Sequence, residues 1–206
     1  MNFGRRRFAL VAVGLLGAWL PPAALGADAD PAVTSVRAFY VVLLDGMKRA
    51  ATLGIRGRYD RFAPAVRATF DLPAMTRIAV GPAWNMITPD EQMALVEAFS
   101  RMTIATYANR FDGFSGERFE VEPITEARNA NRIVRTKIIP VKKDPVALNY
   151  LFHQSPEGWK AIDVHLTGTI SELATKRSEF SSLLKAGGAP ALITSLRERG
   201  DKLLAG

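Results

Sequence analysis

The chain has 206 residues, of which 48 % are hydrophobic and 23 % charged. This composition is typical of a globular protein, and the length suffices for one domain with a packed core. The absence of cysteine excludes disulfides and thiolate metal sites. The formal net charge of +7 is not accompanied by a nucleic-acid-binding motif, so no nucleic-acid partner is expected.

The first residues have the three-part pattern of a secretory signal. Three arginines at 5–7 precede an apolar run at 8–20, and prolines and small residues follow. The apolar run is shorter than the roughly 20 residues that span a bilayer, which favours a cleaved signal peptide over a retained anchor. We expect a signal peptide at 1–26, with cleavage after Gly26 or Ala27. Nothing downstream indicates a cofactor that must be loaded before export, so general secretion is favoured over the twin-arginine route.

Cleavage would lower the net charge to +4 and leave a single domain at 27–206. Apolar residues recur at helical spacing through much of this domain. The strongest local signal is TPDE at 88–91, where Thr88 and Glu91 can form a capping box before a long helix. A second box is expected at Thr169 to Glu172. The predicted helices cover about 31–53, 58–70, 72–80, 89–110, 170–184 and 189–204.

Alternating polar and apolar residues after position 113 predict strands at about 119–122, 132–141, 146–154 and 159–167. The SPEG segment at 155–158 reads as a hairpin loop between the last two. Consecutive strands flanked by helices favour an α+β domain. We expect a curved antiparallel sheet of about four strands, with N-terminal and C-terminal helices enclosing an apolar, cone-like pocket.

The hairpin suggests which side chains share a face of the sheet. If Gln154 lies opposite Trp159, then Tyr150 faces Asp163, and His165 lies on the same face. This constellation is the only one that resembles acid–base chemistry, with Asp163 as a general base in a cone-fold enzyme. The favoured interpretation is that Asp163 accepts structural hydrogen bonds from backbone amides or a tyrosine, with His165 near the edge of the sheet. A one-residue slip of the register would regroup these faces.

Other chemistry has little support in the sequence. There are two histidines, and neither a nucleophile motif, a phosphate loop nor metal-ligand spacing is present, so we expect no metal and no cofactor. Several large apolar residues at helical spacing are most simply interpreted as core, and the alternative is that they form the flexible wall of a lipid pocket. These residues are Met75, Ile78, Trp84, Phe99, Met102 and Tyr107.

Four stretches carry a resemblance to a known family. The sequence resembles the MlaC family of periplasmic lipid-binding proteins, also called toluene-tolerance auxiliary proteins. The segment TGTISELATKRSEF is more similar to the hopanoid-associated HpnM branch than to the phospholipid branch. The four stretches are FDLPAMTRIAVGPAW (70–84), DEQMALVEAFSRMTIATYANRF (90–111), GWKAIDVHLTGTISELATKRSEF (158–180) and GGAPALITSLRERG (187–200).

The resemblance implies a cone related to nuclear transport factor 2, with an apolar pocket that holds a lipid and no enzymatic reaction. It implies a periplasmic shuttle for a hopanoid or a phospholipid, with transient membrane-surface contact. The implied partners are an inner-membrane transporter, of the RND or the Mla-type ABC kind, and an outer-membrane acceptor. An adaptor without a ligand is a third possibility. From strand faces and helix stripes, the expected pocket residues are Met75, Ile78, Trp84, Phe99, Met102, Tyr107, Tyr150, Phe152, Ile162, Val164, Leu166 and Leu173.

Overall fold

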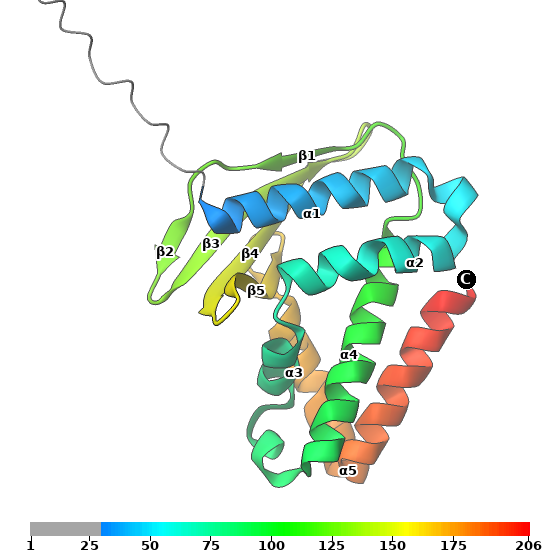
Figure 1. Cartoon of the computed structure of the whole chain (residues 1–206), viewed down its shortest axis with the longest axis vertical. Helices are drawn as coiled ribbons and strands as arrows, with labels where there is room; N and C mark the ends of the chain where they lie inside the picture. The colour runs from blue at the N-terminus through cyan, green and yellow to red at the C-terminus, as the bar shows by residue number, and fades with distance from the viewer. Residues whose placement is uncertain (1–29) are drawn as a thin grey trace, which may run out of the picture.

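A computed structural model describes residues 30–206, so the predicted signal peptide lies outside the described residues. Within this range, helices cover one face of an antiparallel sheet, which confirms the predicted α+β class (Figure 1). The elements in chain order are α1 (Pro31–Lys48), α2 (Ala50–Thr69), α3 (Leu72–Val80), the 3₁₀ helix η1 (Gly81–Met86), α4 (Pro89–Arg110), β1 (Arg118–Val121), β2 (Glu126–Arg128), β3 (Asn131–Ile139), β4 (Val146–Ser155), β5 (Gly158–Leu166), β6 (Ile170–Ser171) and α5 (Glu172–Ala205).

The sheet has six strands in the order β1-β3-β4-β5-β6, and β2 pairs with β3 beside β1. All pairings between these six strands are antiparallel. The four predicted strands correspond to β1, β3, β4 and β5. The two additional strands have three and two residues, which is too short for an alternating pattern to be recognised.

The helices are arranged in two groups (Figure 1). Helix α1 lies along the sheet with α2 beside it, and α4 runs beside the second half of α5. None of the helices in residues 30–206 combines the length and the apolar character needed to span a bilayer.

Helix boundaries follow the sequence signals at some positions and depart from them at others. The capping box of Thr88 and Glu91 is confirmed. The second predicted box is wrong, because Ile170–Ser171 pairs with β5 as a strand and Ser171 caps α5 instead of Thr169. The backbone is non-helical at Gly187 and Gly188, which confirms the predicted break.

The end of the first helix is also displaced from its predicted place. Helix α1 ends at Lys48, and the backbone leaves the helical region again at Gly54, with a φ of 61°. The predicted helix through position 53 is therefore divided into two pieces.

The contact between α1 and α2 depends on a glycine. A Cβ at Gly46 would lie 2.2 Å from a ring carbon of Phe62, whose side chain is fully buried. We expect Gly46→Ala to lower the free energy of unfolding by about 2 kcal/mol, because overpacking outweighs the gain in helix propensity. Urea unfolding would measure the change. Gly113→Ala is the control, since nothing lies within 4 Å of a Cβ there; equal effects of both substitutions would contradict the prediction.

A β-bulge changes the register of the β4–β5 hairpin. Gln154 pairs with Trp159 as predicted, and Phe152 pairs with Ala161. The register then shifts between Leu151 and Phe152, so that Tyr150 pairs with Val164 and not with Asp163. An extra residue on one strand reverses the alternation beyond it. The prediction that Tyr150, Asp163 and His165 share a face is therefore wrong.

Candidate functional site

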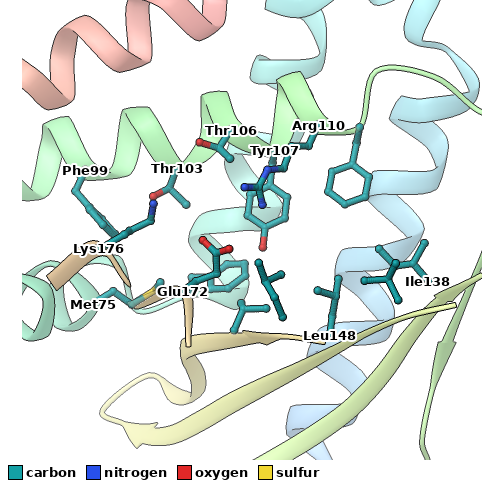
Figure 2. A pocket seen from close by; sticks show the side chains of 15 residues that line it. Met75, Phe99, Thr103, Thr106, Tyr107, Arg110, Ile138, Leu148, Glu172 and Lys176 are labelled. Atoms are coloured by element: carbon teal, nitrogen blue, oxygen red, sulfur yellow. The ribbon is translucent and has the colours of Figure 1, made fainter. Parts of the chain in front are cut away.

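A cavity of about 280 Å³ lies between the sheet and helices α3, α4 and α5 (Figure 2). Its volume is close to the lower end of the range for ligand pockets, roughly 300–1,000 Å³. It is lined by Phe70, Met75, Phe99, Thr103, Thr106, Tyr107, Arg110, Phe111, Ile138, Val146, Leu148, Val164, Leu166, Glu172 and Lys176.

The β-bulge has a direct effect on this cavity. Because of the shift, Val164 and Leu166 lie on the same face of the sheet as Leu148 and Tyr150. An unbroken alternation would have turned Val164 and Leu166 to the opposite face. The bulge therefore supplies two of the apolar side chains that line the cavity.

Aromatic rings form much of the wall at the junction of the helices and the sheet. The Tyr107 ring stacks on Phe111 at a centroid distance of 5.8 Å and also contacts Phe70, which in turn contacts Tyr150. Burial raises the pKa of Tyr107 and of Tyr150 well above the ordinary value. Both phenols are therefore neutral at physiological pH, and they add no charge to the wall.

The apolar wall is interrupted by charged residues from two helices. Arg110 comes from the end of α4, and Glu172 and Lys176 come from the first turns of α5. Figure 2 shows these side chains beside the space between α4 and the sheet. The pKa of Lys176 is lowered from its ordinary value, mainly because of burial. The negative charge of Glu172 raises this pKa, and the positive charge of Arg110 lowers it.

The structure brings five of the twelve expected pocket residues to the cavity. These five are Met75, Phe99, Tyr107, Val164 and Leu166.

Seven of the expected residues do not line this cavity. Four of them are buried in the core, because their helix and strand faces meet other elements of the protein: Met102, Tyr150, Phe152 and Leu173. Ile78 is 39 % exposed on α3. Trp84 and Ile162 are half-buried and pack against the outside of the core.

Sequence reasoning missed ten of the residues that line the cavity. Leu148 had a signal, since it alternates with Tyr150 along β4. The charged residues had none, because a charge on a helix ordinarily indicates a solvated face. The missed residues are Phe70, Thr103, Thr106, Arg110, Phe111, Ile138, Val146, Leu148, Glu172 and Lys176.

Asp163 has a structural environment. Its Oδ1 accepts hydrogen bonds from the backbone amides of Val164 at 2.8 Å and Leu173 at 3.0 Å. Its Oδ2 accepts one from the Ser171 hydroxyl at 2.5 Å, with His165 Nε2 at 3.4 Å. The carboxylate thus joins β5 to the start of α5. It does not line the cavity, and within residues 30–206 no cluster of three or more His, Asp or Glu side chains could hold a metal ion.

The fold and the cavity define a class of protein: a helix-covered open sheet that encloses a mainly apolar space for a ligand. The chain belongs to the MlaC family, whose model, described as MlaC protein, matches residues 43–198. This confirms the resemblance to the family seen in the sequence, while the HpnM branch stays a prediction. No curated protein matches the chain.

A solved structure supports the same assignment. The phospholipid-binding protein from Ralstonia solanacearum, in complex with a phospholipid, is similar to this chain with a TM-score of 0.73 and 25 % sequence identity. The similarity covers 84 % of this chain and 98 % of that protein.

Proposed function

We propose that the protein is a periplasmic lipid carrier that encloses the apolar part of a lipid between the sheet and helices α3, α4 and α5. The observation that carries this proposal is the mainly apolar cavity in a chain of the MlaC family. Shielding apolar surface from water provides about 25 cal/mol per Å². The phospholipid in the Ralstonia protein supports a lipid as the ligand.

The cargo is a hopanoid or a phospholipid. The sequence resemblance of residues 158–180 to the HpnM branch favours a hopanoid, and the similar phospholipid-bound structure favours a phospholipid. The candidate contacts are the five expected residues that lie at the cavity together with its other apolar lining residues. Binding and release of a lipid would require no chemical step.

A carrier of this kind exchanges its cargo with membranes or their transporters. We propose export by the N-terminal signal and shuttling between an inner-membrane transporter, of the RND or the Mla-type ABC kind, and an outer-membrane acceptor. The mildly basic charge of the exported domain would favour transient contact with anionic membrane surfaces.

Mass spectrometry tests the proposal. The protein purified from the periplasm of a hopanoid-producing host is expected to carry about one lipid per chain. A hopanoid would assign it to the HpnM branch, and a phospholipid would assign it to the general role of the family. The same protein refolded after removal of lipid is the control. A native mass equal to that of the bare chain in both samples would contradict the carrier function.

A further inference from the structure

The charged residues at the cavity lack the partners that such residues usually have. Glu172 and Lys176 are four residues apart on α5, a spacing that commonly gives an ion pair on a helix. Yet no ion pair within residues 30–206 includes Glu172, Lys176 or Arg110. Six other arginines of this range do form ion pairs with acidic residues.

Two of these three residues do not lie on an ordinary solvated surface. Glu172 and Lys176 are half-buried beside apolar lining residues, and Arg110 is exposed at the outer end of α4. A charge that is partly removed from water without a partner is costly. Burial lowers the pKa of Lys176 because it disfavours the charged ammonium form.

A hydroxyl that lines the same cavity is also without a partner. Thr103 lines the cavity from α4, and its Oγ1 is buried with no hydrogen-bond partner among residues 30–206. By contrast, the Thr106 hydroxyl donates to the Met102 carbonyl at 2.8 Å. Unpaired buried polar groups call for a ligand or water that satisfies them.

We propose that Arg110 and Lys176, with Glu172, form a headgroup site that selects amphiphiles bearing an oxyanion, a phosphodiester or a carboxylate, over uncharged amphiphiles. This inference rests on the proposed carrier function and holds whether the apolar part is an acyl chain or a ring system. The two cations and one carboxylate leave one net positive charge, which complements a singly charged headgroup. Charge-assisted hydrogen bonds to a phosphate or carboxylate are stronger than neutral ones.

Glu172 has a separate role in this arrangement. Its negative charge raises the pKa of Lys176, while burial lowers it. The carboxylate therefore helps to keep the ammonium protonated when the cavity is empty. It can also accept a hydrogen bond from a hydroxyl of the same headgroup.

Three amphiphiles with one acyl chain in common test the selectivity. Lauroyl lysophosphatidylglycerol carries a phosphodiester, laurate carries a carboxylate, and monolaurin is uncharged. The protein, purified after export of the full chain and stripped of lipid, is titrated with each by calorimetry below the micelle concentration. Each anionic probe is expected to bind with an affinity about tenfold higher than that of monolaurin, or higher still. Tighter binding by only one of them identifies which oxyanion the site accepts.

The variants separate charge from packing. Arg110→Gln/Lys176→Gln is expected to reduce the affinity for the anionic probes to that for monolaurin, with monolaurin itself unchanged. Arg110→Lys/Lys176→Arg keeps both charges and is expected to keep the preference. Lys185→Gln is the matched control, because Lys185 is exposed on α5 and does not line the cavity.

Two results would overturn the headgroup site while leaving the carrier function in place. One is equal affinity of the wild-type protein for all three probes. The other is an equal loss for all three in the double glutamine variant, which would indicate a role in packing alone. Failure of every probe to bind the wild-type protein would instead overturn the carrier function, and the headgroup site with it.

Discussion

Thr106→Trp is expected to abolish most lipid binding while the protein stays folded. Thr106 lines the cavity from α4, and its hydroxyl bonds only within its own helix, so its loss removes no tertiary hydrogen bond. An indole at this position would occupy space that the ligand needs. Displacing about 100 Å² of shielded apolar surface corresponds to about 2.5 kcal/mol, or a roughly seventyfold weaker affinity. The measurement is the amount of co-purified lipid per chain, together with the affinity for laurate.

Glu97→Trp provides the matched control for this substitution. Glu97 is exposed on the same helix and does not line the cavity, so the added indole should leave the lipid content unchanged. Full lipid content in Thr106→Trp, with a normal circular dichroism spectrum, would show that the lipid is held elsewhere.

Asp163→Ala is expected to lower the free energy of unfolding by about 3 to 4 kcal/mol, because two backbone amides lose a charged acceptor. These amides, of Val164 and Leu173, belong to β5 and to the first turn of α5. The Ser171 hydroxyl, which also caps α5, loses its acceptor as well. Urea unfolding followed by circular dichroism would measure the change.

Asp201→Asn is the control, since Asp201 is an exposed acid that pairs with Arg101 at the surface. Surface ion pairs contribute about 0 to 1 kcal/mol, so the effect should be small. If Asp163→Ala unfolded at the same urea concentration as the wild type, the structural role of Asp163 would be refuted. Loss of a chemical turnover without loss of stability would favour the enzyme alternative.

Local sequence signals determined the order and the type of most elements. The capping box at Thr88, the glycine pair at 187–188 and the alternation along β4 and β5 each act over a few residues. Such signals can be read without knowing the fold. The four strands with clear alternation, the α+β class and the family resemblance therefore follow from the sequence alone.

The tertiary structure decided which residues face the cavity. The bulge in the β4–β5 hairpin has no recognisable sequence signal. Because of it, Val164 and Leu166 lie on the same face of the sheet as Tyr150, and Asp163 lies on the opposite face. Likewise, periodicity identifies the apolar side of a helix but not the element that covers it. Met102 therefore lies in the core, whereas Tyr107 on the same helix lines the cavity.

The charged side of the cavity depends on tertiary structure still more strongly. Arg110 and Lys176 are 66 residues apart in sequence, and each follows the pattern of a solvated helix surface. They reach one cavity only because α4 and the first turns of α5 meet beside the sheet. Local structure can be predicted from the sequence, because it depends on neighbouring residues, and so can the family. The site depends on the folded chain, because its walls come from segments that only packing brings together.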